Sequence, residues 1–133
     1  MITLTDYFRG RKHSEEQSKN ALALLARVNA LIDDAQKNGV VLFKNPNTDT
    51  LISGVTEGGF RLPDCCQGAQ KSSHKEAMGV DVFDSRNLLD SWLTKNPEKL
   101  TEFNLYREHP SATEGWCHLT TRPPKSGLRT FLP

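Results

Sequence analysis

The strongest structural signal lies between Ser14 and Gly39, in the sequence SEEQSKNALALLARVNALIDDAQKNG. Ser14 followed three residues later by Gln17 is a capping box, and Asn38-Gly39 is a typical helix stop. Between them, apolar residues recur at helical spacing: Leu24, Leu25, Val28, Leu31, Ile32 and Ala35. The sequence therefore predicts one long amphipathic helix whose apolar stripe packs against a sheet.

Beyond Gly39 the apolar residues come in short runs, which is typical of strands. A second helix is expected after Asp84 or Ser85, ending at Asn96-Pro97. The expected extended segments are 40–43 and 51–55, joined as a hairpin by the turn at 45–49, then 58–61, 79–83, 103–107 and 116–121, with irregular loops at 62–76 and after 121. These patterns predict an α+β fold in which two helices pack on a small, mostly antiparallel sheet.

Size and composition limit the class of protein. The chain has 133 residues, which suits a single domain over 1–133, and its 17 Lys and Arg nearly cancel 16 Asp and Glu. A net charge of +1 argues against a dedicated nucleic-acid binder, and no apolar stretch approaches the ~20 residues of a membrane span. The N-terminus shows no secretory signal, so synthesis in the cytoplasm is expected. The three cysteines include the neighbours Cys65 and Cys66, which favours reduced thiols over a disulfide scaffold.

Two polar residues lie inside apolar strands, where each needs a partner. Asp81 lies within the run 80–83, and His118 follows Trp116-Cys117 in another strand. An unpaired buried carboxylate costs several kcal/mol, and a metal shared with His74 would offset that cost. Two imidazoles and one carboxylate make a three-ligand zinc set that leaves a fourth position for water. Spacing alone leaves an alternative, a hydrogen-bonded structural histidine and a paired aspartate, which is the commoner arrangement.

The segment around His74 and Asp81 carries a family resemblance. Its pattern is Ser72-x-His74-x-x-Ala77-x-Gly79-x-Asp81. This resembles the SxHxxGxAxD signature of the D-Ala-D-Ala carboxypeptidase and endolysin family of zinc peptidases, which is grouped with lysostaphin-type peptidases and the hedgehog signalling domain. Glycine and alanine are exchanged at positions 77 and 79, and because both are small this departure is expected to matter little.

Two further segments resemble the same family. Trp116-Cys117-His118 is similar to its second signature, in which a Trp or His precedes the last zinc ligand by two residues, and Gly59-Phe60-Arg61 is similar to its Gly-Tyr-Arg. The stretch 106–118 resembles the short phage-encoded members. The resemblance spans about residues 58–120 and implies a fold of the hedgehog and D,D-peptidase type.

The resemblance implies a role for each matching residue. His74, Asp81 and His118 would hold Zn2+, Arg61 would bind a substrate carboxylate, and Ser72 would help to orient the substrate. Zinc held in this way polarises the scissile carbonyl and lowers the pKa of its bound water toward about 7.

The catalytic carboxylate is left open between two glutamates. Many family members carry it three residues before the last histidine, where this chain has Gly115. Glu114 is one residue further back, and a spacing of four on a regular strand would place it on the same face as His118. Glu108 occupies a place similar to the upstream glutamate of the hedgehog-like and phage-type branches. Glu108 is favoured, because Glu114 lies in a polar turn where a charge is normally just solvated.

The sequence therefore favours a zinc-dependent peptidase that cleaves peptide bonds of bacterial peptidoglycan, as a D,D-carboxypeptidase or an endopeptidase, encoded by a phage or prophage. The expected partner is the peptidoglycan stem peptide, with no nucleic acid and no membrane insertion, and the oligomeric state is left open. Such a protein would act on the cell wall after release from the cytoplasm or as part of a virion. The alternative is a non-catalytic virion or cell-wall binding module on the same fold.

Overall fold

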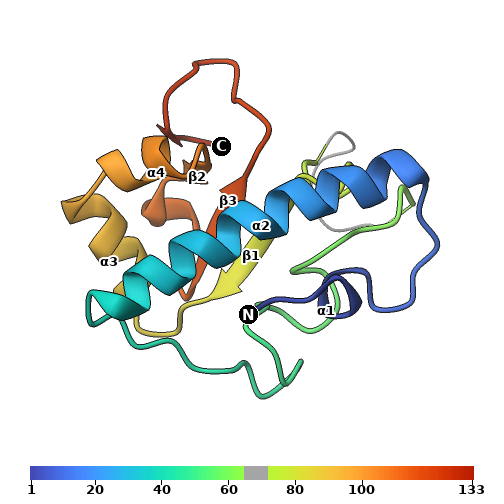
Figure 1. Ribbon diagram of the computed structural model, residues 1–133, viewed down its shortest axis with the longest axis horizontal. Helices are drawn as coiled ribbons and strands as arrows, with labels where there is room; N and C mark the ends of the chain where they lie inside the picture. Colours follow the sequence, from blue (N-terminus) through green and yellow to red (C-terminus); the bar gives the residue numbers. More distant parts are fainter. Residues whose placement is uncertain (65–71) are drawn as a thin grey trace.

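The protein has an α+β fold in which a long helix crosses a four-stranded sheet (Figure 1). The computed structural model describes residues 1–64 and 72–133. The strands are β1 (Gly79–Phe83), β2 (Tyr106–Glu108), β3 (Trp116–Thr120) and β4 (Thr130–Phe131). The helices are α1 (Leu4–Phe8), α2 (Glu15–Lys37), α3 (Leu88–Lys95), α4 (Glu98–Glu102) and the 3-10 helix η1 (Pro110–Ala112).

The sheet is mixed, with the order β1-β3-β2-β4. Both β1 and β2 run antiparallel to β3, as predicted for most of the sheet, while β4 runs parallel to β2 at the edge. The antiparallel pairings join segments that lie far apart in the chain, and they bring β1 and β3 into direct contact at the centre of the molecule.

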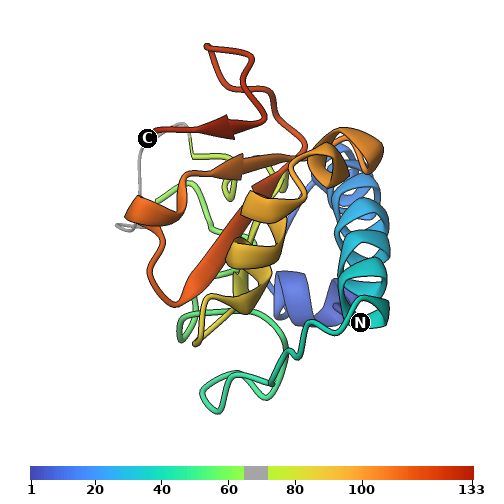
Figure 2. The ribbon, with the colours of Figure 1, turned by 90° about the vertical axis from the view of Figure 1, so that its left-hand side faces the viewer.

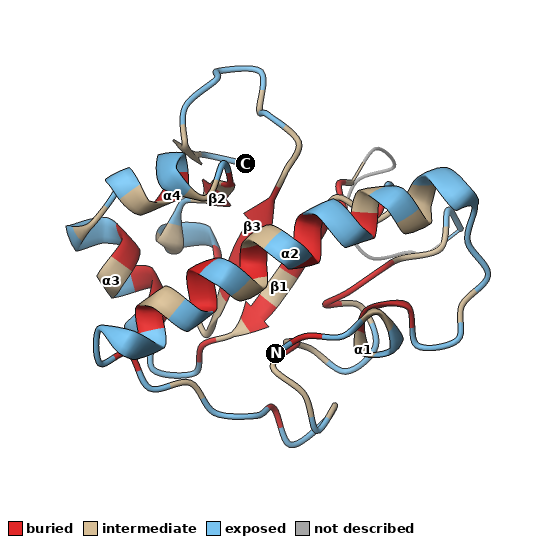
Figure 3. Cartoon of the chain, in the orientation of Figure 1, coloured by how far each residue is buried: buried red, intermediate tan, exposed pale blue. Residues whose placement is uncertain are grey.

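The helix α2 begins and ends where the sequence predicts. Ser14 and Gln17 form the capping box, in which each side chain accepts a hydrogen bond from the backbone N–H of the other. Its buried residues form one stripe: Ala21, Leu24, Leu25, Val28, Leu31, Ile32 and Ala35. Figure 3 shows buried and exposed segments alternating along α2 where it crosses the strands. The predicted amphipathic helix is therefore confirmed.

Strand alternation separates the two faces of the sheet. Val80 and Val82 on β1 and Leu119 on β3 are fully buried and belong to the same hydrophobic core as the stripe of α2. Their neighbours along the strands, Asp81 and His118, therefore project from the opposite face. In the side view, α2 lies along one side of the strands (Figure 2). The polar residues thus lie on the face of the sheet that α2 leaves uncovered.

The second predicted helix is α3, and Asp84 caps it. The Asp84 carboxylate accepts hydrogen bonds from the backbone N–H groups of Leu89 and Asp90, at 3.1 and 3.0 Å. The residue directly before the helix is Asn87, which has a φ of 56° and makes no side-chain capping bond. The helix gives way to Asn96, in agreement with the predicted end.

The predicted hairpin over 40–55 is wrong. An isolated bridge between Asn45 and Thr50 closes the turn, and Ile52 forms its isolated bridge with Val82 instead. The side chain of Asn45 fixes the loop by donating to the carbonyls of Ile52 and Gly54. Val40 and Ile52 reach the core while Val41, Phe43 and Val55 are exposed, but the Asn45–Thr50 bridge is not extended into a ladder between 40–43 and 51–55.

Several short elements also differ from the prediction. Residues 103–105 do not begin a strand, because α4 precedes Phe103 directly and β2 starts at Tyr106. The segment 58–61 forms no strand. The elements α1, α4 and β4 were not predicted, because a five-residue helix covers little more than one helical turn and a two-residue strand shows no alternation.

The N-terminal helix α1 supports the segments on the uncovered face. Tyr7 is fully buried, and its hydroxyl donates to the carbonyl of Gly79, the first residue of β1, at 2.8 Å. Burial raises the pKa of Tyr7, so the hydroxyl keeps the proton that it donates. The Tyr7 carbonyl accepts from the N–H of Phe60, and a Cβ on Gly59 would lie 2.6 Å from that carbonyl oxygen. The helix therefore joins the 58–61 loop to β1.

The variant Tyr7→Phe is expected to lower the free energy of unfolding by about 1–3 kcal/mol, because the buried Gly79 carbonyl loses its donor. Urea unfolding followed by circular dichroism measures the change. The matched control is Tyr106→Phe, since Tyr106 is only partly buried and its ring contacts Arg129. Equal stability of Tyr7→Phe and the wild type would contradict this role of the hydroxyl.

Candidate metal centre

Three segments bring His74, Asp81 and His118 together on the uncovered face of the sheet. Asp81 on β1 and His118 on β3 are direct partners in the antiparallel register, which places both side chains on one face. His74 comes from the turn before β1. Each residue offers one ligand atom, and these atoms all lie within 4.8 Å of one another. The predicted cluster is therefore present.

Asp81 lies at the centre of this cluster. Its Oδ1 is 2.8 Å from Nδ1 of His118 and 3.3 Å from Nε2 of His74. Burial by itself raises the pKa of Asp81, but attraction to His74 and hydrogen bonds from His118 and His74 outweigh burial and hold this pKa well below its usual range. Asp81 is therefore ionised, which is the form that a metal ligand requires.

The hydrogen bond between Nδ1 of His74 and a backbone carbonyl shows which ring nitrogen carries the proton. Nδ1 of His74 lies 2.9 Å from the carbonyl oxygen of Gly59, which can only accept, so Nδ1 carries the proton. In the neutral ring, Nε2 then presents a lone pair to the Asp81 oxygen 3.3 Å away. A second proton on His74 or a metal cation between the two atoms removes that repulsion. His74, Asp81 and His118 thus form a group that can hold a metal ion.

A cleft of about 570 Å³ opens over the cluster. Its lining includes most of the site residues predicted from the sequence: Arg61, Ser72, His74, Asp81, Glu108 and His118. Phe131 of β4 adds an apolar wall, with its ring centroid 6.4 Å from that of His118. The fold therefore gathers a carboxylate, an arginine and a serine around the candidate ligands.

Glu108 lies beside the ligands because of the sheet register. Arg107 on β2 pairs with Leu119 on β3, so the next residue, Glu108, lies opposite His118 when the register continues. Burial raises the pKa of the half-buried Glu108; attraction to His118 opposes this shift, and the charge on Asp81 adds to it. A raised pKa suits a carboxylate that takes up and returns a proton near neutral pH.

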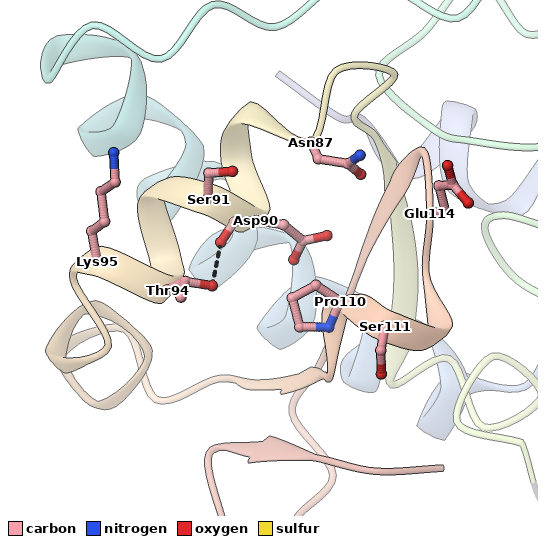
Figure 4. A pocket seen from close by; sticks show the side chains of 8 residues that line it. All are labelled: Asn87, Asp90, Ser91, Thr94, Lys95, Pro110, Ser111 and Glu114. Carbon is pink, nitrogen blue, oxygen red and sulfur yellow. Dashed lines mark hydrogen bonds between the residues drawn. The ribbon is translucent and has the colours of Figure 1, made fainter.

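Glu114 lies at a different cleft. This second cleft, of about 480 Å³, lies between α3 and the turn that precedes β3 (Figure 4). The predicted spacing of four fails because β3 begins only at Trp116 and Gly115 has a φ of +90°, so strand alternation stops before Glu114. Of the two glutamates, Glu108 lines the cleft that contains His118.

The two predicted substrate-binding residues both contact the candidate ligands. Arg61 donates from Nε to the Glu57 carbonyl at 2.7 Å, and its Nη2 lies 3.6 Å from Oδ2 of Asp81. Ser72 accepts a hydrogen bond from the His74 N–H at 3.3 Å. Arg61 thus contacts the carboxylate of Asp81 and Ser72 the backbone of His74, and the contacts of both residues with a substrate stay predictions.

Positions 77 and 79 differ in backbone conformation and in free space, so they are not interchangeable in this chain. Ala77 has a φ of +59°, in the left-handed region that costs a residue with a Cβ about 1–2 kcal/mol. At Gly79 a Cβ would lie 2.2 Å from Oγ of Ser73 and 3.1 Å from Cε1 of His118. The glycine is thus required next to the ligand, while the alanine occupies a conformation that favours glycine.

The variant Gly79→Ala is expected to lower the free energy of unfolding by about 1–3 kcal/mol, because the added methyl overpacks the site. It should also weaken zinc binding, because the methyl displaces Ser73 or the His118 ring. Ala77→Gly is the matched control and should keep the stability within about 1 kcal/mol of the wild type, with unchanged zinc binding. Urea unfolding and zinc titration measure both quantities. Wild-type stability in Gly79→Ala would contradict the packing described here.

Among the described residues, His109 and Cys117 are not part of the ligand cluster. His109 is exposed and caps the 3-10 helix η1. Cys117 is buried in the core, on the opposite side of β3 from His118, as predicted. Cys65 and Cys66 lie outside the described residues.

Sequence reasoning did not single out Ser73 or Phe131. Ser73 is buried, and its Oγ lies 3.4 Å from Nε2 of His118. Phe131 reaches the cleft through β4, a strand of two residues. No pattern marks a serine between Ser72 and His74, and a two-residue strand has no period, so tertiary contacts alone reveal both.

No protein-family model, no curated protein and no solved structure matches this chain. In the described part of the chain, no helix has the length and apolar character needed to span a membrane. The fold and the site define an α+β protein with a candidate metal centre in a cleft on its sheet.

Proposed function

We propose that this protein is a zinc-dependent peptidase that hydrolyses peptide bonds of bacterial peptidoglycan. The observation that carries the proposal is the placement of His74, Asp81, His118 and Glu108 around one cleft. Two imidazole nitrogens and one carboxylate suit zinc and leave a coordination position open, as catalytic zinc sites do. Calcium and magnesium prefer ligand sets made of oxygen atoms, so the two histidines favour zinc over either ion.

The residues of the cleft supply the parts of a hydrolysis. A bound zinc ion would polarise the scissile carbonyl and lower the pKa of water. Glu108 takes a proton from the attacking water and returns it to the leaving amine. Burial raises the pKa of Glu108, so the carboxyl holds that proton more readily than an exposed glutamate does. The Gly59 carbonyl keeps the proton of His74 on Nδ1, which leaves Nε2 as the ligand atom.

The substrate class follows from the resemblance of residues 58–120 to D-Ala-D-Ala-type peptidases. A stem peptide ends in a carboxylate, and the planar guanidinium of Arg61 in the cleft suits that group. Ser72 and Phe131 line the same cleft, where Ser72 would help to orient the peptide and Phe131 would offer an apolar wall for its small side chains. An origin in a phage or prophage, with action on the cell wall after release or within a virion, belongs to the same proposal.

Two measurements on the purified chain test the function. Metal analysis after zinc loading and desalting is expected to find about one equivalent of zinc per chain. Incubation with purified peptidoglycan, followed by mass spectrometry of the muropeptides, should show release of D-alanine or opened cross-links. Zinc binding with unchanged muropeptides would reject the peptidase and favour the non-catalytic binding module. A chain that binds no zinc would contradict the metal centre itself.

A further inference from the structure

The second ring nitrogen of His118 points away from Asp81 and toward Ser73. Nδ1 of His118 lies 2.8 Å from Oδ1 of Asp81, while Nε2 lies 3.4 Å from Oγ of Ser73. Ser73 is only 5% exposed, so water offers little competition for this contact. The Ser73 hydroxyl is therefore the protein partner of Nε2 of His118, the ring nitrogen that does not face Asp81.

The partners of the two histidines differ in chemistry. His74 faces the Gly59 carbonyl, which can only accept, so its proton stays on Nδ1 whether or not a metal is bound. A serine hydroxyl both donates and accepts, because it rotates about its C–O bond. Ser73 can therefore satisfy Nε2 of His118 either with or without a proton on that nitrogen.

We propose that Ser73 is a positioning residue that serves both neutral tautomers of His118, so that metal can load without rotation of the imidazole ring. Without metal, Nδ1–H of His118 donates to the ionised Asp81, and Nε2 accepts from the Ser73 hydroxyl. If a metal were bound, Nδ1 of His118 would be free of its proton to hold the ion, and Nε2–H would donate to Oγ of Ser73. On loading, the proton on Nδ1 would pass to solvent and solvent would supply the proton on Nε2, so the ring would stay neutral. This inference rests on the proposed metal centre.

The surrounding backbone holds Ser73 in place for this task. Its carbonyl accepts from the N–H groups of Glu76 and Met78, which fixes the turn. Gly79 leaves the space that the hydroxyl occupies, since a Cβ there would lie 2.2 Å from Oγ. The glycine of β1 and the serine of the turn thus form one arrangement behind the His118 ring.

The variant Ser73→Ala tests the proposal, with Ser85→Ala, at an exposed position, as its control. Zinc affinity measured by chelator competition is expected to fall about 10- to 100-fold in Ser73→Ala, the range typical of losing a partner behind a metal ligand, and to stay unchanged in Ser85→Ala. Urea unfolding of the metal-free variants shows whether the fold is retained.

Nitrogen-15 NMR of the histidine rings shows which nitrogen of His118 carries the proton. If Ser73 only supported the fold, its substitution would leave the signal of this proton unchanged. In the wild type, the proton of His118 should be on Nδ1 without metal and on Nε2 with zinc. In zinc-loaded Ser73→Ala, the Nε2–H signal should shift and exchange faster with water. A wild type in which zinc binds but the proton stays on one nitrogen, or a Ser73→Ala variant with wild-type zinc affinity, would overturn this inference alone. A wild type that binds no zinc would overturn the metal centre and this inference with it.

Discussion

Replacing His118 by alanine is expected to abolish both zinc binding and peptidase activity. The substitution removes one of three ligands, and the loss of affinity should exceed the 10- to 100-fold typical of losing an outer partner. Zinc at about 100 times its Kd should stabilise the wild type by about 2.7 kcal/mol, whereas the variant should gain nothing at the same concentration. Thermal unfolding with and without zinc, together with muropeptide analysis, measures both effects.

The matched control for this experiment is His109→Ala. His109 is exposed, caps η1 and lies outside the ligand cluster, so its removal should leave zinc binding and turnover unchanged. If His118→Ala bound zinc with an affinity within about tenfold of the wild type, the cluster would not be the metal site, because a lost ligand costs more than a lost outer partner.

The second large effect is expected from Glu108→Gln. A glutamine keeps the shape of the side chain and cannot carry the proton, so kcat should fall about 10²- to 10⁴-fold. Zinc affinity should stay close to that of the wild type, because Glu108 is not among the clustered ligands. Steady-state kinetics on a soluble stem peptide and a zinc titration of the same preparation separate the two quantities.

Glu114→Gln makes the comparison decisive. Glu114 lines the cleft beside α3, so its substitution should leave kcat unchanged. If Glu114→Gln lost activity while Glu108→Gln retained it, the assignment of the proton-transfer group would be wrong. If neither variant changed the turnover of a zinc-loaded, active wild type, a carboxylate mechanism in this cleft would be excluded.

The long helix and the strands with clear apolar alternation were predictable, and the one-turn helices and the two-residue strand β4 were not. The capping box at Ser14 and the apolar stripe that follows it are signals that repeat over several turns, so α2 follows from sequence alone. The strand around Asp81 has the predicted limits for a similar reason, since its apolar neighbours alternate with it. The hairpin over 40–55 failed because apolar residues do not show from sequence whether a partner strand covers them.

The candidate ligands were predictable from residue type, but their environment was not. His74, Asp81 and His118 were singled out because polar side chains in apolar strands need partners, and the structure places them together. The spacing argument for Glu114 assumed that the strand of His118 already includes Glu114. In the structure this strand begins two residues later, at Trp116. The role of Ala77 depends on its positive φ, and that of Gly79 on its close contact with Ser73. Neither feature can be read from a sequence pattern.

The sequence by itself therefore determined the α+β class, the long helix and the residue types of the candidate centre, because these depend on local periodicity and on the cost of burying a charge. The tertiary structure decided which glutamate lines the cleft and which hydroxyl lies behind His118. Both follow from contacts between segments distant in sequence: the β2–β3 register places Glu108, and the turn before β1 places Ser73. A strand register and a turn packed behind a ring form only when the whole chain is folded.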